Sequence, residues 1–200
     1  MAGSTPTVGV LALQGDFREH AAVLRGLGAN VVHVRRPEEL EAIDGLVIPG
    51  GESSVMDKLS RTFGLADPLK DAIAGGLPVY GTCAGLIMLA DSILEGIVGQ
   101  QTIGGLDVAV RRNAFGSQLD SFETDLDIPV LGDEPLHAVF IRAPIVETVG
   151  PRATALAELE DGRVVAVEQG NLLGTSFHPE VTGDIRFHAY FLDKVRTRAH

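Results

Sequence analysis

The stretch Leu77-Pro78-Val79-Tyr80-Gly81-Thr82-Cys83-Ala84-Gly85-Leu86-Ile87-Met88-Leu89-Ala90 decides the fold of this chain. It reads as a short apolar strand, a tight turn between two glycines and an apolar helix. Cys83, the single cysteine among 200 residues, lies at the apex of the turn. Gly81 and Gly85 allow the close backbone approach that a strained strand-to-helix turn requires. The pattern is the cysteine version of the Gly-x-Ser-x-Gly nucleophile elbow, and the start of the helix favours the thiolate over the thiol.

A single cysteine is more often a small buried hydrophobic residue than a nucleophile, so partner residues must decide between the two interpretations. A cysteine nucleophile needs a general base and a group that orients this base. Of the six histidines, His178 directly follows an apolar run at 172–177 and precedes Pro179-Glu180. Proline ends the strand, and the Glu180 carboxylate can accept the imidazole N–H. The sequence therefore predicts a triad of Cys83, His178 and Glu180.

The segments before the elbow alternate between buried strands and helices, a pattern typical of a doubly wound α/β sheet. Strands are expected at 8–13, 30–34 and 45–48 and in the elbow itself, and helices at 16–27, 55–61 and 66–74, with a short helical turn at 37–41. Asp16 is a candidate N-cap for the first of these helices.

The second half reads as strands that are mostly joined without helices, at 105–111, 122–127, 136–141, 154–159, 163–168 and 172–177, followed by a helix at 184–198. Glu160-Asp161-Gly162 is a hairpin turn. We therefore expect one α/β domain over residues 1–200, with a flexible leader at 1–6. Its sheet is doubly wound and mixed, flanked by helices and extended by antiparallel strands.

Polar and glycine-rich segments follow three of the parallel strands. Gln14, Gly50–Ser53 and Cys83 should gather at one sheet edge, because ligands bind beyond the carboxyl ends of such strands. Acyl transfer needs donors for an oxyanion, and the N–H of Ala84 and the turn Pro49-Gly50-Gly51 are the candidates. A phosphate loop is disfavoured because the glycine turn lacks the Walker lysine.

Composition limits the class of function. The net charge of −11 argues against nucleic acid or an anionic membrane as a partner. No apolar run is long enough to span a membrane, and a lone cysteine is typical of a reducing cytoplasm. Without cysteine clusters or paired histidines at ligand spacing, no metal site is expected.

Three motifs together resemble the class I, triad-type glutamine amidotransferases: Pro49–Ser53, Gly81–Gly85 and Ser176–Glu180. Three further segments resemble, more narrowly, the glutaminase subunits of pyridoxal 5'-phosphate synthase: Leu13-Gln14-Gly15, Arg112-Asn113-x-Phe115-Gly116 and Phe140-Ile141-Arg142-Ala143-Pro144. The resemblance covers about residues 8–195, in order and with compatible spacing.

This resemblance implies hydrolysis of L-glutamine to glutamate and ammonia through a glutamyl thioester on Cys83, without a cofactor. It also implies a glutamine pocket lined by Gly51, Glu52 and Ser53, with Gly51 doubling as an oxyanion donor. Arg112 is the implied partner of the substrate carboxylate, and Ile141 and Arg142 are expected to contribute main-chain contacts.

The implied protein partner is a (β/α)8-barrel synthase subunit in a multi-subunit complex that makes pyridoxal 5'-phosphate. Gln14, Arg18, Glu19 and His20 are candidate contacts with it, although 18–20 could equally be an ordinary exposed helix face. Other interpretations remain open at this point: a glutaminase of another pathway, a cysteine hydrolase or peptidase on a similar sheet, or a catalytically silent binding module.

Overall fold

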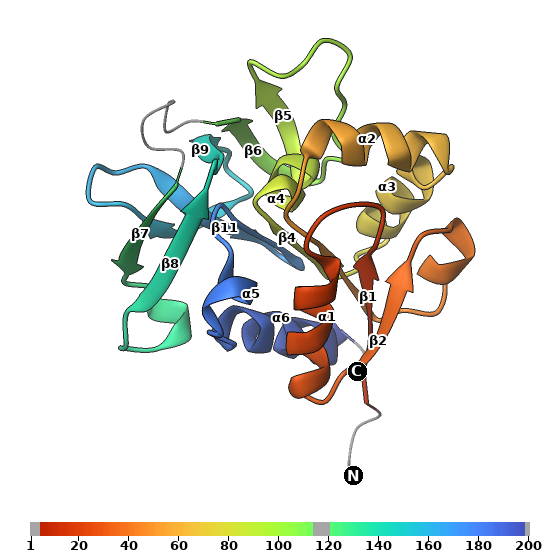
Figure 1. Cartoon of the computed structure of the whole chain (residues 1–200), viewed down its shortest axis with the longest axis horizontal. Helices are drawn as coiled ribbons and strands as arrows, with labels where there is room; N and C mark the ends of the chain where they lie inside the picture. Colours follow the sequence, from red (N-terminus) through yellow and green to blue (C-terminus); the bar gives the residue numbers. More distant parts are fainter. Residues whose placement is uncertain (1–4, 114–120, 199–200) are drawn as a thin grey trace.

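The computed structural model describes residues 5–113 and 121–198 of the chain. A mixed sheet runs through it in the strand order β2-β1-β3-β4-β12-β11-β9-β6-β5, with β10 paired to β11 (Figure 1). Its strands are β1 (Thr7–Leu11), β2 (Asn30–Val34), β3 (Gly45–Ile48), β4 (Val79–Thr82), β5 (Ala90–Leu94), β6 (Leu106–Arg111), β9 (Ile145–Val149), β10 (Thr154–Glu158), β11 (Val164–Gln169) and β12 (Leu172–Thr175). Most of the expected leader, residues 1–4, lies outside the described residues.

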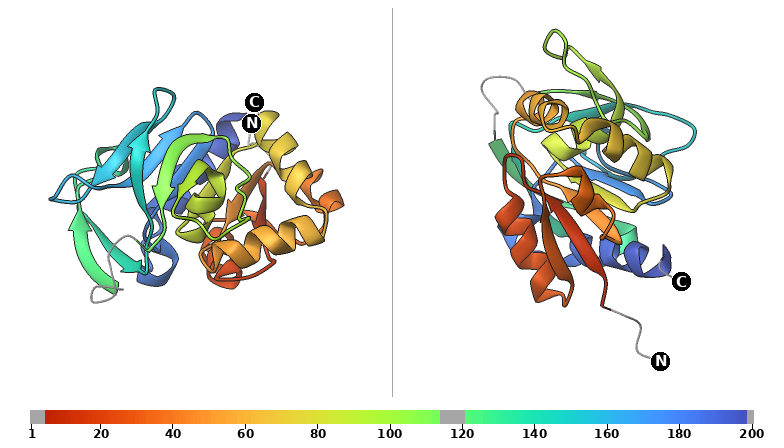
Figure 2. Two further views of the ribbon diagram at one scale, coloured as in Figure 1. Left: turned by 90° about the horizontal axis from the view of Figure 1, so that it is seen from above. Right: turned by 90° about the vertical axis from the view of Figure 1, so that its right-hand side faces the viewer.

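Helices cover both faces of this sheet. They are α1 (Phe17–Gly26), α2 (Ser53–Thr62), α3 (Ala66–Ala74), α4 (Ala84–Leu89), α5 (Pro179–Thr182) and α6 (Arg186–Arg198), with 3-10 turns at Pro37–Leu40 and Pro129–Leu131. A separate two-stranded antiparallel sheet is formed by β7 (Ser121–Leu126) and β8 (Leu136–Ile141). Two perpendicular views show the helices lying on either side of the central strands (Figure 2).

The parallel half of the sheet confirms the doubly wound α/β prediction. β2, β1, β3, β4 and β12 run parallel, and the register pairs Val10 with Val47 and Ile48 with Gly81. Parallel neighbours end at the same edge of the sheet, so the segments after β1, β3, β4 and β12 meet there. This edge carries the candidate site.

Antiparallel strands extend the sheet beyond β12, as predicted for the second half of the chain. β11 pairs antiparallel with β12, β9 with β11 and β6 with β9. The expected hairpin turn joins β10 and β11, and Gly162 there has a φ of 84°, a left-handed conformation that glycine adopts without strain.

Two strands and one short helix were not predicted from the sequence. β9 buries only its first two residues, so it lacks the alternation that marks a half-buried strand. β5 follows the apolar α4 directly, with no Gly or Pro to signal the change of element. The turn expected after His178 is one turn of helix, α5, which begins at Pro179, where the fixed φ of proline suits a first helical position.

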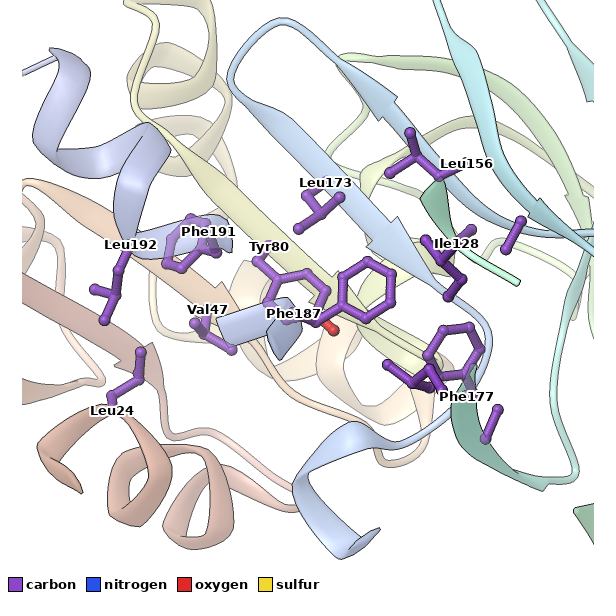
Figure 3. Close-up of a cluster of buried hydrophobic side chains, with 14 of the residues drawn as sticks. Leu24, Val47, Tyr80, Ile128, Leu156, Leu173, Phe177, Phe187, Phe191 and Leu192 are labelled. Atoms are coloured by element: carbon purple, nitrogen blue, oxygen red, sulfur yellow. The ribbon is translucent and has the colours of Figure 1, made fainter. Parts of the chain in front are cut away.

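The core has two layers, one on each face of the sheet. On β3, Val47 belongs to the layer beneath α1 and α6, whereas Leu46 and Ile48 belong to the layer beneath α2, α3 and α4. This alternation follows from the two-residue period of a strand. In the first layer Tyr80, Phe177, Phe187 and Phe191 pack together with Leu24, Val47 and Leu192 (Figure 3). Among the described helices, none has both the length and the apolar character needed to cross a bilayer.

Candidate active site

Cys83 forms the expected elbow between β4 and α4. Its φ of 49° is in the left-handed region, which a non-glycine residue occupies only where the surroundings enforce it. A Cβ on Gly81 would lie 2.5 Å from the carbonyl carbon of Gly85, and a Cβ on Gly85 would collide with the backbone of Ile48 on β3. Both glycines of the motif are therefore required by close backbone approach.

His178 reaches the elbow because its strand lies beside β4. The parallel register pairs Thr82 with Thr175, and the Cys83 N–H donates to the Thr175 carbonyl at 2.7 Å. The His178 N–H donates to Val139 on β8 at 3.0 Å, which anchors the segment after β12 from the other side.

Glu180 orients the His178 ring. Its Oε1 lies 2.7 Å from His178 Nδ1, and both side chains are buried. Since Glu180 is ionised, Nδ1 carries the proton of this bond, and Nε2 is the nitrogen left to act on Cys83. A thiol, an imidazole and a carboxylate in this order are the arrangement that a catalytic triad requires.

The hydrogen bond between His178 and Glu180 favours the charged form of both side chains. Burial of the His178 ring opposes protonation, but hydrogen bonds to Cys83 and Glu180 outweigh it and raise the pKa of His178 to about 10. Burial also opposes ionisation of Glu180, yet hydrogen bonding by His178 and His20 holds the pKa of that carboxyl well below its usual range. A protonated imidazole is the acid that a leaving amine needs.

The glycine turn after β3 is held against the start of α1. The Asp16 N–H donates to the Gly50 carbonyl at 3.1 Å, and the Glu52 N–H donates to Gln14 Oε1 at 2.8 Å. Because N–H and C=O point in opposite directions in a trans peptide, the Gly51 N–H points away from α1. Gly51, with a φ of 150°, lines the same cavity as Cys83 and Ala84.

The cavity at this edge has a volume of about 330 Å³. It is lined by Gln14, Asp16, Gly51, Glu52, Ser53, Cys83, Ala84, Ile87, Arg112, Asn113, Ile141, Arg142 and His178. The residues predicted for catalysis and substrate binding line it, except Glu180, which lies behind His178. Of the residues predicted for oxyanion binding, Ala84 and Gly51 line it, whereas Pro49 and Gly50 do not.

A hydrogen-bonded cluster of charged and polar side chains around Arg112 forms one wall of the cavity. Arg112 donates to Glu52 Oε1 at 2.7 Å and to Gln100 Oε1 at 2.9 Å, and the Gln100 amide donates to Ser53 Oγ at 2.9 Å. Burial raises the pKa of Glu52, but hydrogen bonds from Ser54 and the charge of Arg112 hold that pKa below its usual range. These hydrogen bonds hold the Arg112 guanidinium in one orientation at the cavity, where it can bind a carboxylate.

The main chain at the end of β8 approaches Cys83. Cys83 Sγ lies 4.0 Å from the Ile141 carbonyl oxygen, and Arg142 follows with a φ of 42°. Both residues line the cavity with exposed side chains, and the charge of Arg142 is one of the causes that lower the pKa of Glu52. Phe115 and Gly116 of the segment starting at Arg112 lie outside the described residues.

The four candidate partner contacts, Gln14 before α1 and 18–20 on it, differ in their exposure. Arg18 and Glu19 are exposed, and Gln14 is half-buried in the glycine turn. His20 is fully buried, so the expectation that it contacts a partner, or that it lies on an exposed helix face, is wrong. Successive helix residues differ by about 100° in direction, and two steps from Arg18 turn the His20 ring towards the sheet.

Two residues of the site were missed from the sequence. Asp16 Oδ2 lies 3.7 Å from His178 Nδ1, and Gln100 comes from a segment, 95–104, to which the sequence assigns no role. Neither carries a local signal, because both act through contacts distant in sequence. Asp16, His178 and Glu180 form a group whose ligand atoms lie close enough to hold a metal ion. Since His178 and Glu180 already bind each other, this geometry is explained by the triad.

Comparisons with known proteins agree with this geometry. A model described as the SNO glutamine amidotransferase family matches residues 10–197. The chain is 76% identical over 198 residues to the pyridoxal 5'-phosphate synthase subunit PdxT of Leifsonia xyli subsp. xyli (strain CTCB07), covering 99% of this chain and 100% of that protein.

Two solved structures resemble this chain, one closely and one in its fold. One, described as a glutamine amidotransferase, is 48% identical with a TM-score of 0.88, covering 94% of this chain and 98% of its own. A glutamine amidotransferase from Thermotoga maritima, 16% identical with a TM-score of 0.63, covers 98% of this chain and 86% of its own and shares the fold.

Proposed function

This chain belongs to the SNO glutamine amidotransferase family, and we propose that Cys83, His178 and Glu180 are the triad with which it hydrolyses L-glutamine. The function that follows from the family is that of a glutaminase subunit supplying ammonia for pyridoxal 5'-phosphate synthesis. The observation that carries the residue assignment is the buried 2.7 Å bond between His178 and Glu180 beside the elbow that presents Cys83.

The reaction proceeds by two acyl transfers. The Cys83 thiolate attacks the side-chain amide carbon of glutamine, and the resulting oxyanion accepts hydrogen bonds from the backbone N–H groups of Ala84 and Gly51. His178 gives its proton to the nitrogen, the C–N bond breaks, and ammonia leaves a glutamyl thioester. His178 then takes a proton from water, which attacks the thioester and releases glutamate.

Substrate selectivity comes from the cavity wall formed around Arg112. Arg112 binds the α-carboxylate of glutamine, while Gly51, Glu52 and Ser53 and the backbone at Ile141 and Arg142 line the space between this anchor and Cys83. Glu52 and Gln100 hold the guanidinium in place before substrate arrives, which lowers the cost of ordering it.

The ammonia is passed to a synthase subunit. The name of the Leifsonia relative, a subunit of pyridoxal 5'-phosphate synthase, supports such a partner. We assign it a (β/α)8-barrel fold within a multi-subunit complex. The start of α1 is the proposed contact, through Gln14 and the exposed Arg18 and Glu19, because Gln14 and Asp16 hold the oxyanion turn.

Ammonia release from glutamine by the purified chain, with and without the synthase, tests this function. We expect release that increases when the synthase is added and that is lost in Cys83→Ala. Release by Cys83→Ala at the wild-type rate would refute the nucleophile assignment, and cleavage of peptides or esters in preference to glutamine would refute the substrate.

A further inference from the structure

Two buried histidines lie behind the triad and have no part in the reaction described above. His20 on α1 and His188 on α6 are both fully buried. Their rings meet at 2.8 Å, between His20 Nδ1 and His188 Nε2. Burial of a histidine pair without a function is costly, because each ring must satisfy two polar nitrogens away from water.

The other nitrogen of His20, Nε2, lies near two residues beside the active site, Thr82 on β4 and Glu180 on α5. His20 Nε2 lies 3.0 Å from Thr82 Oγ1, in the residue that directly precedes the nucleophile. The same nitrogen lies 3.5 Å from Glu180 Oε1, the oxygen that also binds His178. His20 thus links the elbow on β4 with the carboxylate on α5, two elements that join only through tertiary contacts.

Hydrogen-bond accounting fixes the proton positions in this chain of rings. Within the described residues, His188 Nδ1 is buried and has no partner. A buried N–H without an acceptor is rarer than a bare acceptor, so the proton of His188 belongs on Nε2. It is donated to His20 Nδ1, and the proton of His20 then lies on Nε2, directed at Thr82 and Glu180. Burial lowers the pKa of His188 to about 3, in keeping with this neutral ring.

We propose that His20 is a positioning residue for the triad: its Nε2–H holds the Glu180 carboxylate and the Thr82 hydroxyl in place, and His188 fixes its tautomer. This inference rests on the proposed function, since Glu180 matters here as the group that orients His178. His20 does not line the substrate cavity. Its loss therefore changes kcat and leaves the KM for glutamine near its wild-type value.

Two amide variants separate the role of each ring nitrogen. In His20→Gln the amide nitrogen takes the place of Nε2, so a donor still faces Glu180 and Thr82. In His20→Asn the amide reaches only the Nδ1 position, beside His188. Both introduce a buried amide of similar polarity, so each is a control for the stability effect of the other.

The measurement is synthase-stimulated glutaminase activity at a temperature below the melting points of both variants. We expect His20→Gln to stay within about threefold of the wild-type kcat and His20→Asn to lose roughly tenfold or more, the worth of one hydrogen bond to a charged group. Equal kcat values, or a more active His20→Asn, would overturn the inference. Absence of glutaminase activity in the wild-type complex would instead refute the proposed function.

A second pair addresses the same inference if His20→Asn does not fold. His188→Gln keeps a donor for His20 Nδ1 and should retain kcat, whereas His188→Leu removes that donor and should lower kcat with KM unchanged. A folded His188→Leu with wild-type kcat would show that the tautomer of His20 has no bearing on the reaction.

Discussion

Replacing Gly50 by alanine should displace the His178 imidazole, the proposed general base, without contacting Cys83. A Cβ at Gly50 would lie 2.5 Å from His178 Cε1 and 3.1 Å from Nδ1, and 3.0 Å from Asp16 Oδ2. Carbon atoms in contact lie about 3.5–4.0 Å apart, so the ring must move by about 1 Å. Its bond to Glu180 and the backbone bond of His178 to Val139 oppose that movement. A misplacement of about 1 Å can lower a rate by about 100-fold, and we expect a loss in kcat of this size.

The assay is glutamine hydrolysis by the complex with the synthase, with kcat and KM measured separately. Gly26→Ala is the matched control, because a Cβ at the end of α1 meets no heavy atom within 4 Å, and its kcat should equal that of the wild type. Overpacking at Gly50 should also cost about 1–3 kcal/mol of stability, so both variants are assayed well below their melting temperatures. A Gly50→Ala protein with wild-type kcat would refute the argument that the ring position limits the reaction.

Three further predictions concern the charges of the site. Glu180→Gln removes the group that orients His178 and should lower kcat by roughly 10²–10⁴-fold, less than Cys83→Ala, in single-turnover assays; an equal loss would contradict a purely orienting role. Arg112→Ala should raise the KM for glutamine by about 10–100-fold, the worth of a charged hydrogen bond, and an unchanged KM would exclude it as the carboxylate anchor. The pKa of His188, about 3 in the folded chain against 6.5 ordinarily, means that the unfolded chain binds a proton below pH 6.5 while the folded chain does not. Stability contributed by this residue is complete above pH 6.5 and is lost as pH falls towards 3, by about 2 kcal/mol at pH 5. Urea unfolding at pH 7.5 and 5 should show a smaller difference for His188→Gln than for the wild type, and an equal difference would contradict the burial argument.

The parallel half of the fold and its catalytic edge could be predicted because their signals are local. β1 and β3 lie in continuous apolar runs that lead into Gln14 and into the turn Pro49-Gly50-Gly51, and the elbow carries its own glycine spacing. His178 was identifiable because Pro179 and Glu180 follow it directly. The structure adds that Thr82 and Thr175 are register neighbours, which is what brings the two motifs together.

The remaining features depend on contacts that leave no local pattern. Arg18-Glu19-His20 reads as one polar segment, yet the helix directs the third residue into the core, where polar partners from β4, α5 and α6 receive it. Gln100 acts through Ser53 and Arg112, 47 and 12 residues away. Because these contacts join residues distant in the sequence, local sequence patterns predict neither the burial of His20 nor the contacts of Gln100.

The position of β12 has a consequence for biosynthesis. β12 is the last strand of the described chain, but it lies in the middle of the sheet, between β4 and β11. It leads into His178, which follows Cys83 by 178 − 83 = 95 residues in the sequence. During synthesis a chain emerges from its N-terminus, so Cys83 leaves the ribosome long before His178 does. If the proposed triad is correct, an incomplete chain that ends before β12 should release no ammonia from glutamine.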